Sequence, residues 1–148
     1  LQWARSQNCP WNSDTCMKAA WGGHLEILKW ARAHGCPWRE DTCSRAALSG
    51  NLEMLQWARS ENRPWHTGTC LDAAENGHLG ILKWARAHGC PWDDDTCSFA
   101  AFGGQLEVIQ WATANGAELV EYATYLAAEG GHLELLQWAV TQGCSLDP

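Results

Sequence analysis

The cysteine and histidine residues are the side chains of this 148-residue sequence that are able to bind a metal ion or form cross-links. The cysteines recur in pairs at one fixed separation, and in two pairs a histidine stands two residues ahead: Cys9 and Cys16, Cys36 and Cys43 after His34, and Cys90 and Cys97 after His88. One histidine and two cysteines fall short of the four ligands of a structural zinc site. The pattern therefore indicates a metal site only if a further ligand comes from elsewhere.

Packing in the protein interior is the alternative that we favour for these cysteines. The equivalent positions elsewhere in the chain hold Arg63, Ala117 and Thr124, so a metal required by the fold would lack ligands there. A buried cysteine behaves as a small apolar side chain. The Cys-Pro dipeptides resemble haem-thiolate motifs, but a proline after a helix also stops that helix. We expect no cofactor and no metal site, and keep a metal- or haem-binding sensor as the alternative function.

Disulfide bonds within a pair require Cα atoms that lie about 4.4–6.8 Å apart, which the sequence leaves open. Cys70 and Cys144 stand outside the pairing. Unpaired thiols are typical of a reducing compartment. We therefore expect an intracellular protein, either in the cytoplasm or in an organelle if a transit segment has been removed.

Residues that catalyse reactions do not gather in the sequence. His24, His78 and His132 recur at one spacing, and Asn51 and Gln105 replace them elsewhere, which favours hydrogen bonding over general base chemistry. Helix capping explains the acidic cluster Asp93-Asp94-Asp95 better than calcium binding, because no loop of alternating ligands follows. Phosphate-binding loops, nucleophile elbows and paired catalytic carboxylates are not found. We therefore do not expect an enzyme.

A period of 27 residues positions all of these side chains. It is clearest in a tryptophan ladder made of Trp3, Trp30, Trp57, Trp84, Trp111 and Trp138. A leucine, a pair of alanines and a glycine keep the same step, as at Leu52, Ala46-Ala47 and Gly50. Strict periodicity indicates stacked copies of one small unit, each of which contacts only its neighbours. We expect the ladder tryptophans to be core residues interleaved between successive copies.

Each copy is predicted to form two short helices. In the second copy the first helix spans Thr42 to Leu48 after a capping Asp41, and Asp14 and Asp95 repeat that placement. Gly50 ends the helix because glycine accepts positive φ. The second helix spans Leu52 to Ser60 on an apolar stripe. It ends where only residues that tolerate a left-handed conformation occur: Asn8, Gly35, Asn62, Gly89, Gly116 and Gly143.

The sequence resembles the ankyrin-repeat family along its whole length. The segments His24-Leu25-Glu26 and His132-Leu133-Glu134 match the start of the family's second helix, and Gly116-Ala117 and the alanine pairs match other positions. The family period is about 33 residues, so the shorter step, with Thr-Cys in place of Thr-Pro-Leu-His, implies a short variant whose β-hairpin finger is shortened or absent. Any binding through such fingers is then not expected here.

The resemblance implies an all-α fold, an α-solenoid of stacked helix-turn-helix repeats. We expect one solenoid domain over residues 1–148, with a half repeat at 1–11 and repeats at 12–38, 39–65, 66–92, 93–119 and 120–148. The sequence does not begin with methionine, so we expect a piece of a longer protein or a processed product.

Charge and hydropathy exclude two classes of partner. The net charge of -7 argues against nucleic acid, because a phosphate backbone attracts basic surfaces. Arg5, Arg32, Arg59 and Arg86 form a ladder, which we interpret as a solvated row offset by acidic neighbours. No apolar run approaches the ~20 residues of a transmembrane helix, so we expect no transmembrane segment.

Partner binding is expected where a constant frame carries varying side chains. The first helices vary most, and in ankyrin-like stacks they line the concave face. We expect a non-enzymatic protein-interaction scaffold, or a linker subunit, that binds another protein or several subunits of a large complex, with Trp21, Leu48 and Phe102 as apolar anchors. The candidate partner-binding residues are Met17, Lys18, Trp21, Arg45, Leu48, Asp72, Glu75, Phe99, Phe102 and Tyr125.

Overall fold

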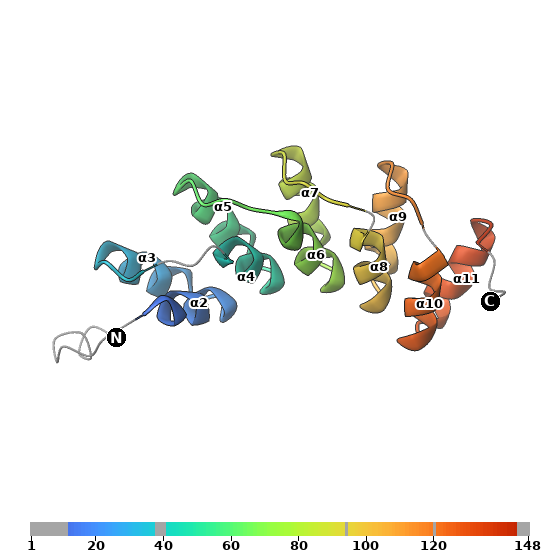
Figure 1. Cartoon of the computed structure of the whole chain (residues 1–148), viewed down its shortest axis with the longest axis horizontal. Helices are drawn as coiled ribbons and strands as arrows, with labels where there is room; N and C mark the ends of the chain where they lie inside the picture. The colour runs from blue at the N-terminus through green and yellow to red at the C-terminus, as the bar shows by residue number, and fades with distance from the viewer. Residues whose placement is uncertain (1–11, 38–40, 94, 120, 145–148) are drawn as a thin grey trace.

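A computed structural model of the chain describes residues 12–37, 41–93, 95–119 and 121–144, which form helices joined by turns and contain no β-strand. Two kinds of helix alternate along the chain (Figure 1). The first helices are α2 (Ser13–Trp21), α4 (Thr42–Leu48), α6 (Thr67–Glu75), α8 (Asp95–Phe102) and α10 (Glu121–Glu129). The second helices are α3 (Leu25–Ala33), α5 (Leu52–Ser60), α7 (Leu79–Ala87), α9 (Leu106–Ala114) and α11 (Leu133–Thr141).

The helices form an α-solenoid, which confirms the predicted fold class. Each first helix packs against the second helix that follows it and against the first helices of the neighbouring pairs. Figure 1 shows the pairs in chain order along a gentle arc, with the first helices on its inner side and the second helices on its outer side. The half repeat expected at 1–11 lies outside the described residues.

The predicted helix bounds are confirmed in the second copy, where α4 and α5 span the expected residues. Gly50 follows the first helix with a φ of +73°, and Asn62 follows the second with a φ of 57°. Both residues therefore take the left-handed conformation that the pattern of glycine and asparagine predicts. Asn8, the first member of that pattern, lies outside the described residues.

Of the predicted aspartate caps in the described residues, only Asp41 stands at the cap position of its helix. Asp41 precedes α4 without a side-chain capping hydrogen bond and instead lies 3.5 Å from Arg45. Asp14 and Asp95 lie in the first turns of their helices. The cap of α2 is Asn12, whose Oδ1 accepts a hydrogen bond from the Asp14 amide at 3.0 Å. Helix α2 therefore begins earlier than the aspartate ladder indicates, with an asparagine, which caps as well as aspartate does, at its cap position.

The interior of the solenoid consists of small and branched apolar side chains. The alanine pairs of α4, α6 and α8 have no exposed surface, and neither do Leu28, Leu55, Leu82 and Ile109, which occupy one position of the second helices. Small side chains on the first helices allow their backbones to approach closely. The larger residues of the second helices fill the space behind them.

The described ladder tryptophans lie at the margin of the core, where they are half-buried, rather than within it: Trp30, Trp57, Trp84, Trp111 and Trp138. Trp3 lies outside the described residues. Two of the ladder tryptophans, Trp84 and Trp111, meet the preceding copy as predicted, but their partners are tryptophans of the loops, Trp65 and Trp92. The ring of Trp65 meets the ring of Trp84 edge to face, with centroids 5.6 Å apart, and Trp92 meets Trp111 in the same way at 5.7 Å. Aromatic pairs prefer this geometry. A shell of indole rings therefore links neighbouring copies on the outer side.

Side chains at the start of each second helix link each copy to the one before it. His78 Nε2 donates to the Leu48 carbonyl at 3.2 Å, and His132 Nε2 donates to the Phe102 carbonyl at 2.8 Å. At the equivalent position Gln105 Nε2 donates to the Glu75 carbonyl at 3.2 Å. The prediction that these residues form hydrogen bonds is confirmed, and the bonds join adjacent repeats.

Replacement of Gly104 by alanine tests this link between repeats. The φ of Gly104 is +70°, and a Cβ atom there would lie 2.4 Å from His132 Nδ1. Left-handed alanine costs ~1–2 kcal/mol, and displacement of the histidine would remove a hydrogen bond of ~1 kcal/mol. We expect Gly104→Ala to lower the free energy of unfolding in urea by about 2–3 kcal/mol.

Gly116→Ala is the matched control, because φ is +90° there and no atom lies within 4 Å of the new Cβ. Its loss should be about 1 kcal/mol, from backbone strain alone. Equal losses for the two variants would show that the histidine contact does not stabilise the stack.

A candidate partner-binding face on the first helices

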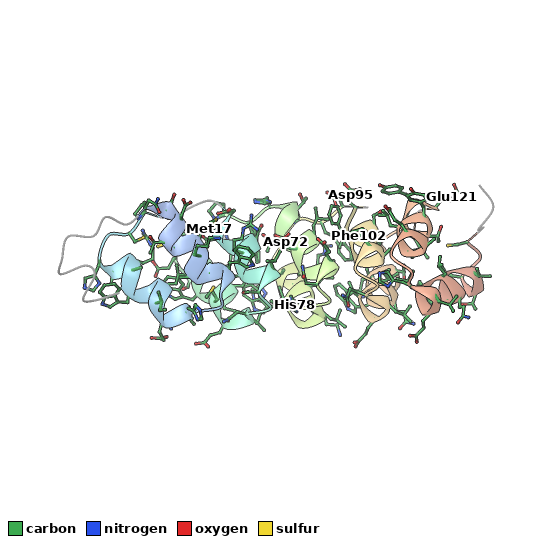
Figure 2. All side chains as sticks on the ribbon, turned by 90° about the horizontal axis from the view of Figure 1, so that it is seen from below. Met17, Asp72, His78, Asp95, Phe102 and Glu121 are labelled. Carbon is green, nitrogen blue, oxygen red and sulfur yellow. The ribbon has the colours of Figure 1, made fainter. Side chains whose placement is uncertain are left out.

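The residues expected to bind a partner all lie on first helices. Met17, Lys18 and Trp21 come from α2, Arg45 and Leu48 from α4, Asp72 and Glu75 from α6, Phe99 and Phe102 from α8, and Tyr125 from α10. Figure 2 is a view onto this side, in which Met17, Asp72 and Phe102 follow one another across the molecule. The stacking of the first helices therefore collects the varying positions on one surface, which we call the first-helix face.

Exposure differs among the expected anchors. Trp21 is 51% exposed and Phe102 is 48% exposed, so both present apolar surface to solvent. Leu48, by contrast, is half-buried. Phe99 and Tyr125 are also exposed. The aromatic surface is thus concentrated at the two ends of the face, on α2 and on α8 with α10.

An open pocket of about 260 Å³ lies between α8 and α10. Its lining residues are Asp95, Ser98, Phe99, Phe102, Tyr122 and Leu126. Beside it the rings of Tyr122 and Tyr125 stack with centroids 5.9 Å apart. Tyr122 and Leu126 were not among the candidate residues. The sequence could have indicated Tyr122 as a candidate, because it is an aromatic residue at a repeat position that is aspartate in three other copies: Asp14, Asp41 and Asp95.

The middle of the face is polar. Arg45 Nε of α4 lies 3.5 Å from Oδ2 of Asp41, the residue before that helix. The Arg45 charge also acts on the Asp72 carboxyl of α6. Burial raises the pKa of the Asp72 carboxyl above its ordinary value, and the Arg45 guanidinium opposes that shift. At the N-terminal end, Lys18 Nζ lies 4.4 Å from the centroid of the Trp21 ring. Basic side chains of the chain itself, Lys18 and Arg45, therefore lie on α2 and α4 of this face.

The arginine ladder is not the solvated row that the sequence suggested. Arg86 is half-buried, its guanidinium carbon lies 4.2 Å from the centroid of the Trp92 ring, and its Nη1 donates to the Cys90 carbonyl at 3.1 Å. Arg59 makes the same contacts with Trp65 and with the Arg63 carbonyl. A planar guanidinium suits both contacts at once. These arginines therefore fasten the loop after each second helix, while Arg5 lies outside the described residues.

Replacement of Arg86 by methionine should separate this role from surface charge. The variant keeps an apolar stem but loses the cation on Trp92 and the hydrogen bond to the loop, and we expect a loss of about 1 kcal/mol in the free energy of unfolding. Lys83→Met removes the same charge from the exposed side of the same helix and should change stability by less than about 0.5 kcal/mol. Chemical denaturation measures both, and equal effects would contradict the stacking role.

The cysteines do not pair in space as their spacing suggested. Cys36 contributes to the raised pKa of Cys16, and Cys70 contributes to the raised pKa of Cys90, so the members of each pair lie close together. Their hydrogen bonds go to the backbone: Cys36 Sγ donates to the Asn12 carbonyl at 3.4 Å, and Cys90 Sγ donates to the His66 carbonyl at 3.7 Å. Each pair joins a first helix to the end of the second helix in the same copy, so the expectation that Cys70 lacks a partner there is wrong. All cysteines of the described residues are free thiols, and all except Cys144 are buried. Sequence neighbours across a loop are not spatial neighbours here, because each helix pair folds back on itself.

Burial makes Cys16, Cys43 and Cys90 poor nucleophiles, whereas the interaction with Cys90 lowers the pKa of the Cys70 thiol. Burial raises the pKa of Cys16 to about 12 and that of Cys43 to about 11, from 9.0 for an ordinary thiol. The neighbouring Cys70 thiol and burial raise the pKa of Cys90. Since the thiolate is the reactive species, a raised pKa keeps the thiol protonated and unreactive at neutral pH. Packing is thus the observed role of these side chains.

A thiol-reactive disulfide reagent at pH 8 tests this difference in exposure. On the order of one Cys16 thiol in ten thousand is ionised at that pH, so Cys16 should stay unmodified in the folded protein. We expect rapid modification of Cys144, which is half-exposed. A Cys9→Ser background removes the cysteine that lies outside the described residues, and Cys144→Ser should then remove the rapid phase. Rapid modification that persists would contradict the burial of the other thiols.

Among the residues that the structure describes, no three histidine, cysteine, aspartate or glutamate side chains are arranged to hold a metal ion. None of the helices in the described part of the chain has the length and apolar character needed to cross a membrane. No protein-family model matches the sequence, and no curated protein matches it. The function must therefore be argued from the geometry of the first-helix face.

Proposed function

We propose that this protein is a non-enzymatic interaction module that binds another protein through its first-helix face. The observation that carries the proposal is the exposed aromatic surface around the pocket between α8 and α10, where Phe99, Phe102, Tyr122 and Tyr125 are 40% to 61% exposed. Contiguous apolar surface of this kind marks partner sites. Large aromatic side chains also supply most of the binding energy in protein interfaces.

The shape of the molecule supports a protein partner over a small ligand. The first helices stand side by side along the inner side of an arc (Figure 1). Solenoids use such extended concave surfaces to bind other macromolecules. The pocket occupies only one part of this surface. A partner that covers the whole face would contact the aromatic residues of α8 and α10, the polar centre at Arg45 and Asp72, and Trp21.

The proposal includes membership of the ankyrin-repeat class in a short form. Its support is the alternation of short helices, the left-handed glycine between the helices of each pair, and the histidines that donate to the preceding copy. The loops after the second helices fold onto arginine and tryptophan, and strands are absent from the described residues. Because a compact loop replaces the hairpin finger, the finger offers no surface to a partner. The first-helix face is then the surface that binds.

The proposal also places the protein in a reducing compartment. Cys16 and Cys36 are neighbouring, buried free thiols, and so are Cys70 and Cys90. Neighbouring thiols of this kind persist unbridged in cells where glutathione and thioredoxin keep them reduced. A role as a linker subunit within a larger assembly is consistent with binding along the whole face.

Replacement of both Phe99 and Phe102 by alanine tests the proposed face. Because both rings are exposed, the thermal unfolding temperature should stay within about two degrees of the parent protein. The loss of two aromatic anchors should reduce partner capture about ten-fold or more. Capture is measured by affinity purification from the native source with quantitative mass spectrometry.

Leu133→Ala with Val140→Ala is the matched control. These residues are 65% and 47% exposed on α11, a second helix, and their replacement removes apolar surface away from the proposed face. The control should capture the same proteins as the parent chain. Undiminished capture by the phenylalanine variant would refute the proposed face.

A further inference from the structure

The Lys and Arg residues of the chain all lie in its first 86 residues, whereas acidic residues occur throughout. Arg86 is the last Lys or Arg in the sequence. The acidic residues that follow it are Asp93, Asp94, Asp95, Glu107, Glu118, Glu121, Glu129, Glu134 and Asp147. Asp95, Glu121 and Glu129 belong to α8 and α10 and are exposed. The C-terminal part of the first-helix face therefore carries negative charge with no basic residue in its own repeats.

The aromatic pocket lies within this acidic region. Phe99, Phe102, Tyr122 and Leu126 give it apolar walls, and Asp95 adds a carboxylate. Figure 2 shows Asp95 and Glu121 along one edge of the face, with Phe102 nearer its middle. The faces of aromatic rings attract cations. A side chain with a long apolar stem and a charged end matches both the walls and the rim of this pocket.

The first copy shows how a cation occupies the equivalent position. Phe102 is equivalent to Trp21, and Phe99 is equivalent to Lys18. Lys18 Nζ lies 4.4 Å from the centroid of the Trp21 ring, so α2 covers its aromatic residue with its own ammonium group. The repeat of α8 keeps the aromatic ring and the aspartate at its equivalent place but has phenylalanine in place of lysine. A cation at the equivalent place on α8 would therefore have to come from another molecule.

We infer that the pocket between α8 and α10 binds a basic peptide segment of the partner protein. One arginine or lysine side chain lies against Phe102 and Tyr122, with its charge toward Asp95. Arginine fits best, because its planar, weakly hydrated guanidinium stacks on aromatic rings. Glu121 and the neighbouring carboxylates speed the approach of such a segment. This inference rests on the proposed function and names the chemistry of the partner.

Nuclear magnetic resonance of the ¹⁵N-labelled whole chain tests the inference with two synthetic probes. The first is the blocked peptide Gly-Arg-Gly-Arg-Gly, and the second carries citrulline, which has nearly the shape of arginine but no charge, at both arginine positions. The arginine peptide should shift amide signals of α8 and α10 in a saturable way at millimolar concentration. The citrulline peptide should bind at least about five-fold more weakly.

Variants locate the binding within the pocket. Asp95→Asn and Phe102→Ala should each weaken the arginine peptide about three- to ten-fold. Asp14→Asn removes the equivalent carboxylate of α2, and Leu133→Ala removes exposed apolar surface from α11; neither should change the affinity. The two aspartate variants are matched in charge and position. Unchanged spectra elsewhere in the chain show that each variant is folded.

The outcomes separate this inference from the proposed function. Equal binding of the two peptides, shifts outside α8 and α10, or no shifts at all would each overturn the basic-peptide assignment. If the Phe99 and Phe102 variant still loses partner capture in that case, the proposed face stands with a partner of different chemistry. Undiminished capture by that variant refutes the proposed function whatever the peptides do.

Discussion

The close approach of neighbouring first helices is the constraint on which the structure depends. Ala46-Ala47 and Ala73-Ala74 have no exposed surface, and their small side chains let one first helix pack directly on the next. On the outer side, tryptophan rings such as Trp65 and Trp84 stand between the copies. Small residues inside and large rings outside bend the stack into an arc with the first helices on its inner side (Figure 1).

This arrangement separates the frame from the surface. Stability comes from contacts between adjacent copies, which use the alanine pairs, the leucines of the second helices and the indole rings. The side chains of Trp21 and Phe102 are about half exposed, so that position can vary at little cost to the packing of the fold. One regular scaffold can thus carry three different surfaces in turn: an aromatic residue on α2, polar residues on α4 and α6, and an aromatic, acidic surface on α8 and α10.

The sequence predicts those features that depend on backbone conformation. The bounds of α4 and α5, and the left-handed Gly50 and Asn62, follow from local residue preferences combined with the period. It does not predict contacts between side chains that meet only after the chain folds back. The stacking of Arg86 on Trp92, the contact of Cys70 with Cys90 and the depth of the tryptophans are of this kind.

The same distinction applies to the candidate site. The expected residues gather on one face because their place in the repeat fixes their place in the stack. The pocket was not predicted, because Tyr122 and Phe102 come from different copies and meet only across the interface. The varying anchor positions are also the ones whose carbonyls accept the links between repeats, at Leu48, Glu75 and Phe102. These hydrogen bonds therefore also hold the backbone at Leu48, Glu75 and Phe102. A changed side chain at these positions is presented from a fixed place, and little backbone freedom is lost when a partner binds.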